Sequence, residues 1–223
     1  MQEQTYAITG KAESVSASNK LIRNTYALLS MTLLFSAITA GLSMVFNFPP
    51  LGILLTLGGF YGLLFLTTRL RNSAWGILSV FALTGFMGLT LGPMINAYLK
   101  VFSNGGELVM LAMGGTGVIF LGLSGYALTT RKDFSFLTGF IVTGVLVAFI
   151  AGIAALLFNL PALSLVVSMM FMLLMAGTIL YQTSDMVHGY ETNYIMATIS
   201  LYVSIFNLFT SLMHLLGAFS GED

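Results

Sequence analysis

Residues 134–158 read FSFLTGFIVTGVLVAFIAGIAALLF, a stretch with no charged side chain and no proline. An α-helix rises about 1.5 Å per residue, so this stretch spans roughly 37 Å, more than the ~30 Å hydrocarbon core of a bilayer. Its residues are apolar on all sides rather than alternating between polar and apolar, which excludes a barrel strand. The stretch therefore predicts a transmembrane helix, and the fold class it indicates is all-α.

The rest of the chain repeats this pattern. The AVILMFWYC residues make up 57% of the 223 residues, charged residues only 7%, and the mean hydropathy is +0.94. Soluble domains carry about 25% charged residues, so this composition indicates an integral membrane protein. Charged residues and proline or glycine breaks set apart six further apolar stretches, and the sequence predicts one domain, a seven-helix bundle over residues 24–219. The six stretches are 24–46, 51–68, 73–99, 107–130, 161–187 and 194–219.

The basic residues predict the orientation, because lysine and arginine near helix ends stay on the cytoplasmic side. With the N-terminus inside, only Lys100 lies outside. We therefore expect a multi-pass membrane protein with a cytoplasmic N-terminus and a C-terminus on the opposite side of the membrane. The polar residues 1–23 lack the apolar core of a signal peptide and are interpreted as a flexible cytoplasmic tail. The basic residues on the inside are Lys11, Lys20, Arg23, Arg69, Arg71, Arg131 and Lys132.

Charge and residue usage exclude several function classes. Eight basic and eight acidic side chains give no net charge, so there is no basic surface for nucleic acid. The chain has no cysteine and only two histidines, and we expect neither a metal site nor a cofactor. Ser124 in a GLSG run and His214 resemble a rhomboid protease pair, but the predicted topology separates them by roughly 15–20 Å in depth. We expect no enzymatic activity.

Two features predict how the helices pack. The connections 47–50, 131–133 and 159–161 are short, so consecutive helices are expected to be antiparallel neighbours. Small residues four apart let helix backbones approach closely, and we interpret them as contacts within the bundle, with an oligomer interface as the alternative. These residues are Gly58 and Gly62, Gly88 and Gly92, and the series Gly144, Ala148 and Gly152.

Polar side chains inside a membrane are costly and mark candidate functional positions. On the last helix, Ser200, Ser204, Asn207, Ser211 and His214 share one face by their spacing of three and four residues. On the helix before it, Thr178, Gln182 and Asp185 share a face, which is expected to meet the last helix near Ser204. We consider two interpretations: interhelical hydrogen bonding that only stabilises the bundle, and a gated polar path through Gln182, Asp185, Ser204, Asn207 and His214.

The segment SLYVSIFNLF at residues 200–209 resembles the signature of the Bax inhibitor family. The segments LTTRKDFSFL at 128–137 and HGYETNYIMATISLYVS at 188–204 also resemble this family, and the similarity runs from about residue 20 to the end. The resemblance implies a seven-helix inner-membrane protein with a cytoplasmic N-terminus.

Two functions follow from the resemblance. A bacterial branch of the family modulates the membrane-anchored AAA metalloprotease FtsH, which implies FtsH as a partner and residues 1–23 as its handle. Other members form a pH-sensitive calcium leak gated by an aspartate pair, which implies calcium as a second partner. The positions of that pair correspond here to Gln182 and Ser204, which retain oxygen atoms but cannot titrate. The leading expectation is therefore FtsH modulation, and the alternative is a cation leak between the last two helices.

Overall fold

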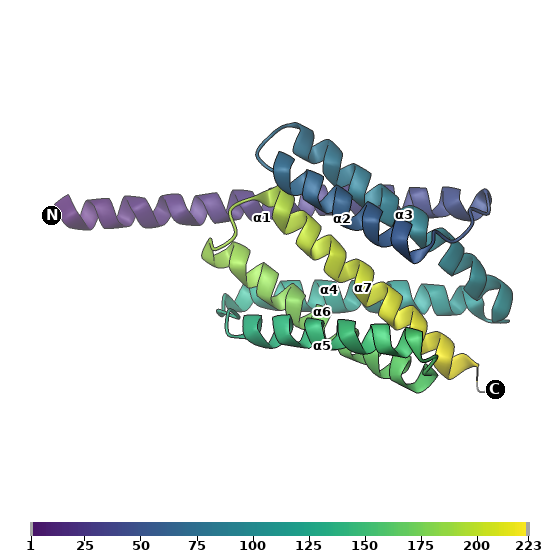
Figure 1. Ribbon diagram of the computed structural model, residues 1–223. Helices are drawn as coiled ribbons and strands as arrows, with labels where there is room; N and C mark the ends of the chain where they lie inside the picture. The colour runs from purple at the N-terminus through teal and green to yellow at the C-terminus, as the bar shows by residue number, and fades with distance from the viewer. Residues whose placement is uncertain (1, 222–223) are drawn as a thin grey trace.

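The structure is a computed structural model that describes residues 2–221, with side chains described from Ser16 onward. Seven helices are long and apolar enough to cross a membrane; six match the predicted stretches within about three residues, and the first begins at Ser16 rather than at residue 24. The prediction of an all-helical membrane bundle is thus confirmed (Figure 1). The helices are α1 (Gln2–Val45), α2 (Ile53–Leu70), α3 (Trp75–Val101), α4 (Gly105–Thr130), α5 (Leu137–Leu157), α6 (Pro161–His188) and α7 (Tyr194–Ser220).

Several helices end at a residue in the left-handed region of the backbone map. Asn47 follows α1 with φ 47°, Arg131 follows α4 with φ 51°, and Asn159 lies beyond α5 with φ 49°. Asparagine tolerates this conformation better than most residues, and Pro49 and Pro161 soon after prevent the helix from continuing. Gly189, with φ 76°, ends α6 in the usual way. These reversals keep the connections short.

Helix α7 lies at the centre of the bundle. Its most apolar window is 61% buried, whereas that of α2 is only 6% buried. It packs against α1, α3, α4 and α6, and in Figure 1 it crosses between a group formed by α1, α2 and α3 and a group formed by α4, α5 and α6. The last helix in the chain therefore joins the two groups.

The expectation that every pair of consecutive helices packs side by side is wrong in part. Helix α1 packs mainly against α3 rather than α2, and α4 packs against α6 and α7 rather than α5. A short connection fixes only the ends of two helices. Along the rest of its length, each helix packs against the neighbour whose surface fits it best. In lipid this fit depends on close packing rather than on hydrophobicity.

Small residues explain the contact between α1 and α3 and the contact between α5 and α6. At Gly88 on α3, an added Cβ would collide with the Thr39 hydroxyl and the Ser36 carbonyl of α1, so the two backbones nearly touch. At Gly144 on α5, an added Cβ would meet Leu174 of α6. Both contacts confirm packing within the bundle. Gly58 and Gly62 differ, because they face outward with nothing near their Cβ positions.

The N-terminal residues continue α1 beyond the bundle. The apolar span of α1 begins at Ser16, the first residue of the packed core is Leu21, and the preceding turns project away from the other helices (Figure 1). The residues interpreted as a tail are therefore helical from Gln2, and packing starts slightly before residue 24. The mobility of this segment stays a prediction.

Candidate functional site

Two side-chain contacts join α6 and α7 at different depths. Ser204 Oγ donates to Gln182 Oε1 over 3.4 Å, and Ser168 Oγ lies 2.8 Å from His214 Nδ1. The two contacts are separated by roughly 15 Å along α7, because each residue adds about 1.5 Å of rise. The expected meeting of the two polar faces thus occurs at Gln182 and Ser204. His214 belongs to a second contact nearer the other end of the helix.

Asn207 lies between these two contacts and joins neither. Its amide Nδ2 donates to the carbonyl of Val203 in its own helix over 2.8 Å. The side chain is half-buried, although it sits at the midpoint of α7. Asn207 therefore presents a polar group at the depth where a transmembrane helix is farthest from water.

Asp185 lies in the last turns of α6 and belongs to the end of the bundle. The charged and titratable groups close to it are Tyr181 one turn earlier and His188 at the end of α6, together with Asp133 and Glu191 from the adjoining connections. Among residues 16–221, no group of three histidine or acidic side chains could hold a metal ion. The structure therefore distributes the five candidate residues over four places, and a gated polar path that joins them stays a prediction.

The connections at this end are tied to one another. Ser184 on α6 donates to the Lys132 carbonyl over 3.1 Å and accepts from the Phe134 amide at the same distance. Tyr190 donates to Asp133 Oδ2 over 3.3 Å. The Ser135 amide donates to the other Asp133 oxygen and holds the pKa of this carboxyl below its usual value. The loops after α4 and α6 therefore form one unit.

Asn193 attaches a third connection to this unit. Its Oδ1 accepts from the amides of Ile195 and Met196 and caps the start of α7. Its Nδ2 donates to the Arg71 carbonyl over 3.1 Å and to Asn72 Oδ1 over 2.9 Å. The α2–α3 connection is therefore held beside the first turn of α7.

The sequence analysis missed a buried polar cluster in the bundle. Tyr202 Oη lies 2.5 Å from the Ser36 hydroxyl and donates to the Thr84 carbonyl over 3.1 Å, which joins α7 to α1 and α3. A signal for it exists in α1, where polar residues recur at spacings of about seven and four. All of them are buried in the structure: Thr25, Thr32, Ser36 and Ser43.

Ser124, which is buried, belongs to a separate polar contact. Its hydroxyl is 3.4 Å from that of Thr183 on α6, and Tyr26 on α1 lies equally close to Thr183. His214 contacts Ser168 instead. The serine and histidine that resemble a protease pair thus bond to different residues, and a serine needs its base within hydrogen-bond reach.

Comparison with known proteins gives the family. The family model described as Inhibitor of apoptosis-promoting Bax1 matches residues 18–221. The Escherichia coli K12 protein named Modulator of FtsH protease YccA is 50% identical over 210 residues, or 94% of each chain. A second Escherichia coli protein, named Inner membrane protein YccA, has the same identity and coverage. Mouse Protein lifeguard 4 is 30% identical over 215 residues, which are 92% of this chain and 87% of the mouse protein.

These similarities extend across all seven helices, including the buried cluster and the contacts between α6 and α7. The family and the Escherichia coli relative are described as inhibitors or modulators rather than enzymes. The chain is a multi-pass protein of the bacterial inner membrane, and it belongs to the Bax inhibitor family.

Proposed function

We propose that this protein binds the FtsH protease and modulates its activity on membrane proteins, using the N-terminal part of α1 as the contact. The observation that carries the proposal is the 50% identity, over 94% of both chains, to a protein named as a modulator of FtsH. The seven apolar helices support a location in the membrane, where the chain could meet a membrane-anchored protease.

The distribution of basic residues supports a cytoplasmic N-terminus. Six of the described basic side chains belong to the end of the bundle where α1 enters and α2, α4 and α6 finish, whereas Lys100 belongs to the opposite end. Basic residues are retained on the cytoplasmic side, so this end faces the cytoplasm and the end of α7 faces the periplasm. The six are Lys20, Arg23, Arg69, Arg71, Arg131 and Lys132.

The projecting part of α1 is accessible at this end. Two pockets, of about 340 and 140 Å³, lie beside α1 where it leaves the bundle, and Ser18 lines both. Their other walls are the end of α4, with Arg131, and the segment from Val187 at the end of α6 to Thr192. From Gln2 to Ser16 the helix extends about 20 Å at 1.5 Å per residue. It can therefore contact a neighbouring protein without disturbing the bundle.

Deletion of residues 2–15 tests this proposal. Leu21 belongs to the packed core, so the deletion stops before Ser16 and leaves the bundle intact. In proteoliposomes with purified FtsH and a membrane-protein substrate, the full chain should slow degradation. The truncated chain should restore the rate measured with FtsH alone, because the contact has been removed.

A variant in which residues 2–15 become a glycine–serine segment of equal length is the control. It preserves the reach of the segment and removes its side chains. Loss of modulation in this variant would assign the contact to the side chains, whereas retained modulation would assign it to length. Undiminished modulation by the deleted chain would contradict the proposal.

A cation leak is a second candidate, and one contact favours it. Gln182 and Ser204 lie at the positions that correspond to the aspartate pair of the calcium-conducting members, and their side-chain oxygens are 3.4 Å apart. Two carboxylates at this separation would share a proton and titrate together. The fold thus supports a gate at this contact, although the present side chains are neutral.

Calcium entry into liposomes, measured at about pH 6 and about pH 8, tests this candidate. We expect the Gln182→Asp/Ser204→Asp double variant to conduct with pH dependence and the unmodified chain to match protein-free liposomes. That result would mean that the fold can form a leak path, but that Gln182 and Ser204 do not support calcium conduction. Calcium entry through the unmodified chain would establish the leak without a carboxylate pair.

A further inference from the structure

One face of α7 is left open by its neighbours. Most residues of α7 that face α1, α3 and α4 are buried, but Ser200, Asn207, Thr210 and His214 are half-buried, and His214 also bonds to Ser168 at the edge of α6. Their spacing of seven, three and four residues places them along one line of the helix. We name these four residues the polar stripe.

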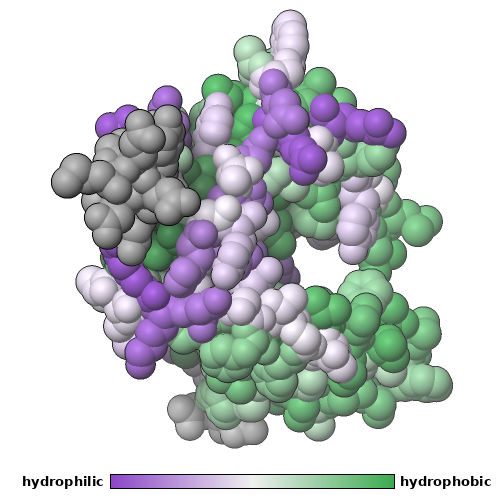
Figure 2. Space-filling model, turned by 90° about the vertical axis from the view of Figure 1, so that its left-hand side faces the viewer, coloured by the Kyte–Doolittle hydropathy of each residue, from purple (hydrophilic) through white to green (hydrophobic). Residues whose placement is uncertain are grey.

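A groove lies over the polar stripe. In Figure 1, α7 is visible without obstruction between the group of α1 to α3 and the group of α4 to α6. Figure 2, seen from the end where α1 projects, shows the molecule hollowed on its right-hand side between the same two groups. This side corresponds to the face that points at the viewer in Figure 1. The groove therefore opens sideways into the bilayer rather than toward water.

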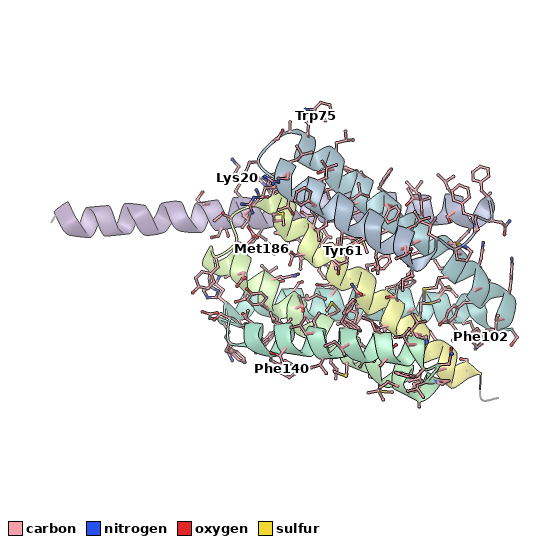
Figure 3. All side chains as sticks on the ribbon, in the orientation of Figure 1. Lys20, Tyr61, Trp75, Phe102, Phe140 and Met186 are labelled. Atoms are coloured by element: carbon pink, nitrogen blue, oxygen red, sulfur yellow. The ribbon has the colours of Figure 1, made fainter. Side chains whose placement is uncertain are left out.

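Further polar groups border the groove. Gln182 on α6 is half-buried and meets α7 through Ser204. Tyr61, near the middle of α2, is 56% exposed and lies on the edge of α2 that faces α7 in Figure 3. Helices α6 and α2, on the two sides of the groove, thus each add a polar side chain to those of α7 at its base.

The polar stripe extends over most of the membrane. From Ser200 to His214 the helix rises about 21 Å, against about 30 Å of hydrocarbon. The longest gap in depth within the polar stripe is about 10 Å, from Ser200 to Asn207, and half-buried Gln182 on α6 lies within it at the depth of the buried Ser204. A polar group moving along the groove would therefore always have a hydrogen-bonding neighbour. Half-buried polar side chains at this depth are costly, which favours a polar occupant of the groove.

We propose that this groove carries phospholipid head groups between the two leaflets while the acyl chains remain in the surrounding bilayer. The movement is downhill and bidirectional and needs no energy source. Phospholipids of the surrounding bilayer can enter through the side opening of the groove. This activity is separate from the proposed modulation of a protease.

Charge complementarity favours a phosphate-bearing occupant. The Asn193 side chain holds the Arg71 backbone beside the first turn of α7, and the Arg71 side chain is exposed there. His214 lies toward the opposite end of the polar stripe. A guanidinium and an imidazole can each bind a phosphate oxygen, one near each leaflet. The hydroxyl and amide groups between them can replace water around the head group.

The test uses the full chain in liposomes of phosphatidylethanolamine and phosphatidylglycerol with a fluorescent head-group-labelled phosphatidylethanolamine. Dithionite bleaches only the outer leaflet, so protein-free liposomes keep the inner-leaflet signal. We expect the chain to expose this signal to bleaching. Asn207→Leu should slow the loss, and Asn207→Gln should keep it, because only the first removes the amide at the membrane centre.

Asn207→Leu should fold normally, since this amide bonds only within its own helix. Ser200→Val provides a second, independent interruption of the polar stripe. Bleaching no deeper than in protein-free liposomes would overturn the proposal, as would unchanged rates in both variants. If the lipid assay is silent but Asn207→Leu abolishes modulation of FtsH, the groove holds a transmembrane helix and the lipid proposal is wrong. Because the lipid assay contains no protease, its result is independent of the proposed function.

Discussion

Tyr202→Ala is expected to lower the free energy of unfolding by about 3–5 kcal/mol, the range for removal of a large buried ring. Tyr202 is 1% exposed and belongs to the largest core cluster, where it packs among residues of several helices. Its hydroxyl also bonds to Ser36 and to the Thr84 carbonyl. The substitution therefore leaves a cavity and two buried polar groups without their partner.

Tyr202→Phe separates these two contributions. It keeps the ring and removes the hydroxyl, and the unpaired groups should cost about 1–3 kcal/mol. Tyr26→Phe is the matched control, because its half-buried hydroxyl lies 3.4 Å from Thr183 and makes a weaker bond. Unfolding in mixed detergent micelles, followed by circular dichroism, measures all three. Equal stability of Tyr202→Phe and the unmodified chain would contradict the role of the hydroxyl.

The number of the spans, and the bounds of all but the first, could be predicted from the sequence. A bilayer demands about 20 apolar residues per helix, so length and charge alone identify each one. Residues 134–158, for example, correspond to α5 at Leu137–Leu157. The contact of Gln182 with Ser204 followed from helix spacing, because residues three or four apart share a face and adjacent antiparallel helices bring such faces together.

The arrangement of the helices could not be predicted in this way. Lipid and the protein interior are equally apolar. Hydrophobicity therefore does not distinguish α7, which is largely buried, from α2, which is mostly exposed. For the same reason the face of Asn207 could not be assigned. Helix spacing places Asn207 on the same face as Ser204. Asn207 stays half-buried only because α2 and α6 do not cover it, and the sequence does not give their positions.

Gly88→Val is expected to disrupt the contact between α1 and α3. An added Cβ would collide with the Ser36 carbonyl, which is backbone and cannot rotate away. Overpacking costs about 1–3 kcal/mol and more where the backbone must move, and here two whole helices would have to separate. The contact also adjoins the bond between Ser36 and Tyr202, so the buried polar cluster should loosen with it.

Gly62→Val is the matched control, because nothing lies within 4 Å of its Cβ position. Its stability should change by less than about 1 kcal/mol, the difference in helix propensity between glycine and other residues. The same unfolding assay compares the two variants. Similar stabilities for both would contradict the close approach of α1 and α3. A loss at Gly62 alone would mean that the outward face of α2 is covered by another transmembrane helix in the folded protein.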